Sequence, residues 1–292
     1  MEKKIIILSI LIILFSITTS SVGLFFNDGG VAFYVENVVG DTVKIFGNGL
    51  YAHDSYFKAP IYKGTDAIIL FLIIPLFIIT VFLHSKDLIA MRLLHLGLVV
   101  VLLYYSISLA MGAAYNILFL VYILLFSACL FAVIIGICNL AYSRITEDAI
   151  RAMPNKSIAA FLFVAGLSVF VWFIEIIEAL LTGSPPSLLG ISTTEPTFVL
   201  DIGIIAPVAF YSAWLVYKRK PFGYILAIML LTLNSAIGLI VISQSAFQYY
   251  YGVMVSLQEL IAYVAVFVVM SSIAFVLNYI ILKNIQMYSS TI

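Results

Sequence analysis

The sequence predicts an all-α integral membrane protein, a bundle of eight transmembrane helices with a small extracytoplasmic β-hairpin between the first two helices. Hydrophobic residues make up 64% of the chain, charged residues only 10%, and the mean hydropathy is +1.20. A soluble domain carries about 25% charged residues, so this chain has too few to cover a water-facing surface. Eight apolar stretches also have the length of about 20 residues that a bilayer requires.

The eight stretches follow one another with short connections, which fits one transmembrane domain over residues 1–292. Pro75 and Pro207 lie inside the second and sixth stretches, where spanning helices tolerate proline because neighbouring groups satisfy the freed carbonyl. The 14 basic and 14 acidic residues cancel, so no basic field predicts a nucleic-acid partner. The predicted spans cover residues 5–25, 65–84, 89–111, 117–142, 157–181, 197–217, 222–243 and 255–282.

The first stretch has two interpretations. Met1-Glu2-Lys3-Lys4, the apolar run that follows it and Thr18-Thr19-Ser20-Ser21 are compatible with a cleaved signal peptide over about residues 1–22, which would leave seven helices and an external amino terminus. The apolar stretch continues to Phe26 without an A-x-A cleavage site, which favours a retained first helix.

The distribution of lysine and arginine predicts a cell-membrane protein with both termini in the cytoplasm, because cytoplasmic loops are enriched in these residues. Three basic residues fall on the outside: Lys44, Lys58 and Lys63. The other eleven fall on the inside: Lys3, Lys4, Lys86, Arg92, Arg144, Arg151, Lys156, Lys218, Arg219, Lys220 and Lys283.

The only sizeable segment between spans covers residues 27–63. Its runs 31–39 and 42–46 are rich in β-branched and aromatic residues and flank Gly40-Asp41, a sequence typical of a two-residue hairpin turn. The run 49–57 that follows is rich in turn residues and aromatics. We expect a β-hairpin over the outer mouth of the bundle, which either seals it or docks a partner.

Five carboxylates are predicted in the outer third of the bundle, and an ionisable residue at membrane depth is costly enough to suggest a functional role. The sequence places no lysine or arginine beside them within the predicted spans. We expect three of them to converge on a shared outer cavity, with the other two at its rim and one tyrosine nearby. The converging residues are Glu175, Asp201 and Glu259, the rim residues are Glu178 and Asp66, and the tyrosine is Tyr263.

Such a cavity would suit a proton, a hard cation or a small amine, because crowded carboxylates bind protons more tightly and carboxylate oxygens favour hard cations. Three of the five residues also have simpler interpretations. Asp201 could cap a helix, although it lies deeper than Pro196, a natural first helical residue, and capping therefore explains it less well. Asp66 follows Gly64-Thr65 at the predicted start of a span, where it would cap the helix. Glu178 would simply reach the headgroup region.

The second and sixth spans show a weak internal echo. Each has an aspartate early in the span and a proline further on, Asp66 with Pro75 and Asp201 with Pro207. Four spans separate them, which fits two parallel four-helix halves, an arrangement that some transporters use. The two spacings, nine and six residues, differ.

The remaining candidates predict no cofactor. His53, His84 and His95 do not form a metal-binding pattern and are interpreted as ordinary hydrogen-bonded histidines. Cys129 and Cys138, nine residues apart on one helix, are about 13 Å apart along its axis and too distant for a disulfide. Tyr104-Tyr105 and Tyr249-Tyr250-Tyr251 are assigned to the outer interfacial aromatic belt.

The run 49–57, followed by Gly64-Thr65-Asp66 at the start of a span, resembles a group of prokaryotic multi-pass membrane proteins with no assigned activity. The resemblance covers about a fifth of the chain. It implies the same kind of membrane protein and no catalytic or binding residue. The chain lacks the residues required by major-facilitator transporters, retinal-binding rhodopsins, rhomboid proteases and ceramidase-like zinc hydrolases.

Three functional interpretations follow, in descending order. The first is a transporter or a solute- or cation-binding permease with an outward-facing carboxylate cavity. The second is a membrane-embedded sensor or accessory subunit that docks a membrane or extracytoplasmic protein through the outer loop. The third is an intramembrane enzyme that uses paired carboxylates as acid and base on a lipid. In each of them the lipid bilayer surrounds the bundle.

Overall fold

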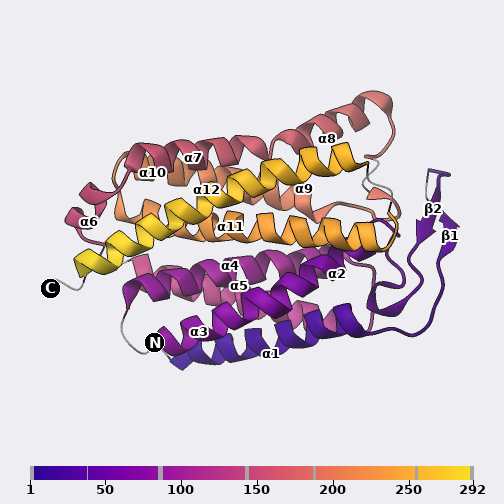
Figure 1. Ribbon diagram of the computed structural model, residues 1–292, viewed down its shortest axis with the longest axis horizontal. Helices are drawn as coiled ribbons and strands as arrows, with labels where there is room; N and C mark the ends of the chain where they lie inside the picture. Colours follow the sequence, from indigo (N-terminus) through magenta and orange to yellow (C-terminus); the bar gives the residue numbers. More distant parts are fainter. Residues whose placement is uncertain are drawn as a thin grey trace.

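The computed structural model is a bundle of long helices lying side by side, with a two-stranded hairpin at one end and both chain ends at the other (Figure 1). The structure describes residues 3–37, 39–84, 88–141, 145–186, 189–253 and 256–289. We call the two ends of the bundle the hairpin end and the terminal end.

The regular elements account for most of the described chain. In order they are α1 (Lys3–Phe25), β1 (Phe33–Glu36), β2 (Thr42–Ile45), the 3-10 turn η1 (Gly49–Tyr51), α2 (Lys58–Ile68), the π-helix η2 (Ile69–Ile73), α3 (Ile74–His84), α4 (Ile89–Gly112), α5 (Phe119–Ala141), α6 (Glu147–Ala152), α7 (Asn155–Ser168), α8 (Val171–Thr182), α9 (Pro196–Leu200), the π-helix η4 (Asp201–Ile205), α10 (Ala206–Tyr217), α11 (Pro221–Tyr250) and α12 (Leu257–Ser289).

Within the described ranges, eight helical stretches are long and apolar enough to cross a membrane, which confirms the predicted number by length and composition. Their bounds are Lys3–Phe25, Lys58–Leu83, Ile89–Gly112, Phe119–Leu140, Asn155–Thr182, Pro196–Tyr217, Pro221–Tyr250 and Val264–Tyr288. The second span begins at Lys58 instead of residue 65. The fifth span bends between α7 and α8.

The early start of the second span corrects two predictions. Lys58 and Lys63, expected in the outer loop, lie on α2 and are buried, so basic residues do stand beside a predicted carboxylate within a span. Asp66 lies well inside α2, so the interpretation as a helix cap was wrong. Pro60 is compatible with this start, because the first N–H groups of a helix have no intrahelical partner.

Spans two and six each contain a π-helix. Each π-helix ends two residues before the proline of its span, Pro75 or Pro207. In η2 the backbone bond runs from the N–H of Ile74 to the carbonyl of Ile69, and in η4 from Ala206 to Asp201. A proline ring clashes with the carbonyl four residues before it, and the wider π turn relieves that clash. The aspartate-and-proline pattern that spans two and six have in common is therefore accompanied by a π-helix in each span.

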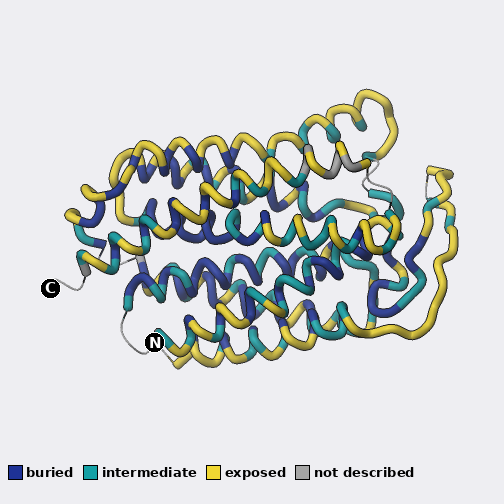
Figure 2. The backbone as a smooth tube through the Cα atoms, viewed as in Figure 1, coloured by how far each residue is buried: buried dark blue, intermediate teal, exposed yellow. Residues whose placement is uncertain are grey.

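Helices α4 and α11 form the centre of the bundle. They contact each other, and each also contacts the spans before and after it in the chain. They are among the most buried elements, as the dark tube in Figure 2 shows. No residue of α8 is buried, and its tube is mostly yellow. The third spans of the two halves thus provide the core.

The predicted hairpin is confirmed. Strands β1 and β2 pair antiparallel, with Phe33 opposite Ile45 and Glu36 opposite Thr42. The hairpin projects from the bundle beside the loop around Gly190 (Figure 1), whose carbonyl accepts a hydrogen bond from the Asn37 side chain at 3.2 Å. The hairpin is therefore tied to the loop that precedes span six.

The turn is longer than predicted. The N–H of Asn37 donates to the carbonyl of Asp41, so these two residues continue the ladder and the turn lies between them. The Asn37 side chain accepts bonds from the N–H groups of Val39 and Asp41. Gly40 has φ +90°, which glycine adopts without steric cost. Gly40-Asp41 is therefore not the two-residue turn, because Asn37 organises a wider one.

The distribution of basic residues predicts the orientation of the bundle. Reporter domains fused after residues 50, 148, 190 and 219 should report outside, inside, outside and inside. The first and third positions lie in η1 and in the segment before α9, and the second and fourth lie in α6 and between α10 and α11. Activity of a periplasmic and of a cytoplasmic reporter at each site checks this. Two fusions on the opposite side would refute the orientation.

Candidate functional site

The carboxyl group of Asp66 is fully buried on α2. The Tyr51 hydroxyl donates to its Oδ2 at 2.7 Å and the Tyr105 hydroxyl donates to its Oδ1 at 2.5 Å. Both carboxyl oxygens therefore have a phenolic donor, which a buried charged or polar group needs. Asp66 was expected at the rim of a cavity, and the structure places it in the packed interior.

A buried cation accompanies Asp66. Lys63, one turn earlier, donates from Nζ to the carbonyls of Gly23 at 2.9 Å and Leu24 at 3.2 Å, near the end of α1. The last carbonyls of a helix carry negative partial charge, so an ammonium group is stabilised there. Lys63 also interacts electrostatically with Asp66. This contact joins α1 to α2.

The approach of α1 requires glycine at position 23. A Cβ atom built on Gly23 would lie 2.0 Å from Asp66 Oδ2 and 2.7 Å from the Tyr51 hydroxyl. Any side chain there would displace the carboxyl or the tyrosine. Backbone from α1, a loop tyrosine and two further spans therefore meet at one carboxyl group.

Tyr51 lies in the outer loop, which was considered as a docking surface for a partner. Its side chain is fully buried, and Leu50, Asp54 and Ser55 are buried too. Burial, followed by the nearby Asp66 carboxyl, raises the pKa of Tyr51 well above its usual value, so its hydroxyl keeps the proton that it donates. These residues of the segment face the bundle instead of a partner.

Asp201 has a similar environment on η4. The Tyr104 hydroxyl donates to Oδ1 at 3.1 Å, and Trp172 Nε1 donates to Oδ2 at 2.9 Å. Tyr104 and Tyr105 are neighbours on α4, so one central helix provides a hydroxyl to each buried aspartate. The assignment of this pair to an interfacial aromatic belt was wrong, because both hydroxyls bond carboxylates inside the bundle.

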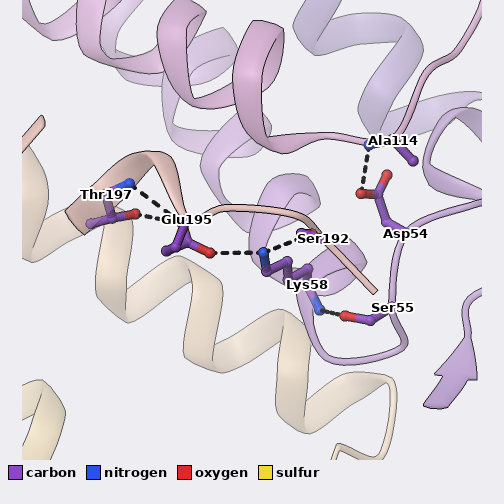
Figure 3. Close-up of polar contacts among 7 residues, drawn as sticks. All are labelled: Asp54, Ser55, Lys58, Ala114, Ser192, Glu195 and Thr197. Carbon is purple, nitrogen blue, oxygen red and sulfur yellow. Dashed lines mark hydrogen bonds and ion pairs between the residues drawn. The ribbon is translucent and has the colours of Figure 1, made fainter. Parts of the chain in front are cut away.

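Glu195 was missed by the sequence analysis. It is the N-cap residue of α9 and forms an ion pair with Lys58 at 2.7 Å, with both side chains largely buried. Lys58 also donates to Ser192 Oγ at 3.2 Å, and Thr197 Oγ1 donates to Glu195 (Figure 3). The signal was present, because an acidic residue directly before Pro196 is typical of a helix start.

Glu195 brings two of the predicted residues together. It interacts electrostatically with Asp201 and with Glu175. Glu175 is half-buried on α8, and its Oε2 is shielded from solvent with no hydrogen-bond partner among the described residues. Glu178 is exposed on the same helix. The region of Asp201 is thus acidic, apart from Lys58.

Two predicted residues remain untested. Glu259 and Tyr263 lie on α12, and their side chains fall outside the described part of the structure. The convergence of Glu175, Asp201 and Glu259 on a cavity stays a prediction. Two surface hollows, of about 480 and 440 Å³, are lined by residues of α1 and α5 and by residues around the end of α8, and neither includes a predicted carboxylate. Among the described side chains, no three His, Cys, Asp or Glu could hold a metal ion.

The eight apolar helices of the described chain are consistent with a multi-pass α-helical membrane protein. No protein-family model, no curated protein and no solved structure matches the chain.

A further carboxyl group lies at the hairpin end, outside the spans. Asp54 is buried, its Oδ1 accepts the N–H of Ala114 at 2.9 Å, and its Oδ2 has no hydrogen-bond partner among the residues that the structure describes (Figure 3). Burial raises the pKa of Asp54 to about 7, although the Ala114 bond and the nearby Lys58 act in the opposite direction. Asp54 therefore changes charge near neutral pH.

Asp54 predicts a pH dependence of stability. Its pKa is higher in the folded than in the unfolded chain, so the folded state binds the proton more tightly, and stability should fall as pH rises from about 4 to about 7. Thermal unfolding of the purified protein between pH 5 and 8 measures this. Asp54→Asn should flatten the decline, whereas Asp41→Asn, an exposed carboxylate of the hairpin, should leave it unchanged. Equal slopes in the wild type and Asp54→Asn would contradict the assignment.

Proposed function

We propose that this protein is a transporter or a solute- or cation-binding permease, and that Asp66 and Asp201 are its central binding groups. One observation carries the proposal. Each aspartate lies within a spanning helix and accepts hydrogen bonds from two aromatic donors, one of which comes from the Tyr104-Tyr105 pair of α4. A carboxyl group at membrane depth costs about 2.5–3.5 kcal/mol on insertion scales, and such residues mark ion and substrate pathways.

The two aspartates differ in their charged neighbours. Asp66 has the buried ammonium group of Lys63 beside it. Asp201 has Glu195 nearby, and the charge of Glu195 is matched by Lys58. This leaves Asp201, together with Glu175, as the acidic group that a bound cation or small amine would neutralise.

The backbone supports movement near both aspartates. The π-helices η2 and η4 lie at or just after Asp66 and Asp201, and π turns are frequent at functional sites. The Lys58–Glu195 ion pair joins span two to span six at the hairpin end. A solute that enters between the two halves from that end would have to displace it.

In this proposal the protein lies in the cell membrane with both termini in the cytoplasm. The basic residues of the terminal end favour the cytoplasmic side. The hairpin and the buried run 49–57 would then cover the outer face of the bundle. Tyr51 would link that cover directly to the Asp66 site.

A second candidate function is a sensor or accessory subunit. The observation that favours it is the hairpin surface, where Val31, Tyr34 and Val39 are exposed. An extracytoplasmic protein could pair with or pack on these strands. The Asp66 and Asp201 sites would then have no solute to bind.

Ligand-dependent thermal stability tests the proposal. A ligand that binds only the folded protein stabilises it, by about 2.7 kcal/mol at a concentration of 100 times its Kd. We expect Na⁺, K⁺, Ca²⁺, Mg²⁺ or a small primary amine to stabilise the purified protein at fixed pH. The response to protons is measured in an Asp54→Asn background, which removes the pH dependence that Asp54 itself causes. Asp201→Asn should abolish the response to cations and amines, and Asp66→Asn should weaken it.

Glu36→Gln is the matched control, because Glu36 is an exposed carboxylate on the hairpin. It should respond to the ligands as the wild-type protein does. If no cation, amine or proton changes the stability of the wild type, or if the response survives in Asp201→Asn, the permease proposal fails.

A further inference from the structure

A buried histidine lies deeper in the same helix that carries the tyrosine pair. His95 of α4 is buried, and its Nε2 lies 3.2 Å from Ser9 Oγ on α1, while its Nδ1 lies 3.0 Å from Thr80 Oγ1 on α3. The ring of Phe77 stacks on the imidazole with centroids 4.6 Å apart. Three spans therefore hold one ionisable ring in the terminal half of the bundle. Such a residue suggests a proton relay.

The neighbours of His95 can satisfy both of its protonation states. A hydroxyl has one hydrogen and two lone pairs. Ser9 Oγ can donate to the carbonyl of Ile5 and Thr80 Oγ1 to that of Phe77, and both hydroxyls then accept from a doubly protonated ring. If either hydroxyl turns its hydrogen to the ring, the neutral form is satisfied. No rearrangement of the helices is needed between the two states.

Along α1, between the contacts with His95 and Asp66, several hydroxyl-bearing side chains are buried in the bundle. Ser9, Ser16, Thr19 and Ser20 are all fully buried, and Gly23 touches Asp66 at the hairpin end of this series. Ser9 and Ser20 donate to carbonyls of their own helix. Small residues alone would indicate only close helix packing.

Two of these hydroxyls differ from packing residues. Ser16 Oγ and Thr19 Oγ1 are inaccessible to solvent and have no hydrogen-bond partner within the described ranges. Buried polar groups in proteins are nearly always paired, and where protein groups are lacking an ordered water takes the place. The two hydroxyls therefore mark a position for water between Asp66 and His95.

We infer that α1, the second span and α4 enclose a proton pathway from Asp66 to His95, with water held at Ser16 and Thr19. The inference rests on the proposed function and deepens it, because it names the proton as the transported or coupled ion. The Asp66 carboxylate first takes up a proton from the hairpin end. That O–H bond then breaks, the proton moves through water as one O–H bond breaks and the next forms, and a ring nitrogen of His95 takes it up, which leaves Asp66 again as a carboxylate beside Lys63. His95 releases it toward the terminal end.

Ser9 and Ser16 are about 10 Å apart along α1, and the fully buried, apolar Ile12 lies between them. The π-helix η2 contacts α1 and lies between Asp66 and Thr80 on the second span. A change in this π turn would open or close the apolar layer. The backbone irregularity would then serve as the gate.

The charged and titratable groups on the elements around His95 leave Asp66 as the acid of this pathway. By sequence, α1, α3, α4, α5 and α11 contain no carboxylate. The other ionisable residues in the terminal half of these elements and of α12 are Lys3, Lys4, His84, Arg92, Cys129, Cys138, Tyr224, Tyr279, Lys283 and Tyr288.

Cysteine accessibility tests the hydration of the pathway. In a full-length Cys129→Ala, Cys138→Ala background, Ser16→Cys and Thr19→Cys should react with a small water-soluble methanethiosulfonate, because the reaction needs a hydrated thiolate. The controls are Leu98→Cys, in the packed core, and Ile10→Cys, on the exposed apolar face of α1. We expect the two pathway positions to react about tenfold faster than both controls. Rates as slow as the controls in folded variants would overturn the inference.

Nitrogen NMR of histidine-labelled wild-type protein tests the second carrier without any substitution in the pathway. The chain has three histidines, so His53→Gln and His84→Gln assign two of the signals and leave the third to His95. We expect the ring of His95 to change protonation state between about pH 5 and pH 9. A ring that keeps one state throughout this range would overturn the inference, even if a pathway variant fails to fold.

The outcomes separate this inference from the proposed function. Loss of the ligand response in Asp201→Asn together with unreactive cysteines would leave the permease proposal standing and remove the proton pathway. The opposite result is reactive cysteines and a titrating His95 in a protein whose stability responds to no cation, amine or proton. It would remove the permease proposal and leave the hydrated pathway standing.

Discussion

The structure depends on the way one central helix satisfies two buried carboxyl groups. Tyr104 and Tyr105 are neighbours on α4, and because successive helical residues point about 100° apart, they reach Asp201 and Asp66 in different halves of the chain. A lost donor would leave a buried carboxyl oxygen unpaired, at a cost of about 1–3 kcal/mol. The position of α4 therefore fixes the second and sixth spans relative to each other.

The same constraint explains the hairpin end. Asp66 needs a second donor, which Tyr51 of the run 49–57 provides, and the ammonium group of Lys63 holds the end of α1 beside them. The Lys58–Glu195 ion pair then closes the two halves over these contacts. The outer segment is consequently part of the core, and the carboxyl sites lie under it.

Short-range sequence patterns predicted the structures that depend on neighbouring residues. The eight spans and the hairpin follow from apolar length and strand alternation, and both were confirmed. The positions of Lys63 and of Tyr105 could not be predicted in this way. A lysine three residues before an aspartate was assigned to a loop, because the carbonyls of α1 that receive it are about 40 residues away. The phenolic donors of Asp66 are likewise distant in sequence, so only the tertiary structure shows which carboxyl each tyrosine meets.

A double-mutant cycle between Tyr105 and Asp66 tests the central claim directly. The free energies of unfolding of Tyr105→Phe, Asp66→Asn and the double variant are measured in one mild detergent, with Tyr115→Phe, an exposed tyrosine, as the control. Residues that share a hydrogen bond couple by about 0.5–3 kcal/mol, and we expect a value in this range for Tyr105 and close to zero for Tyr115. Additivity of Tyr105→Phe and Asp66→Asn within about 0.3 kcal/mol would contradict the account.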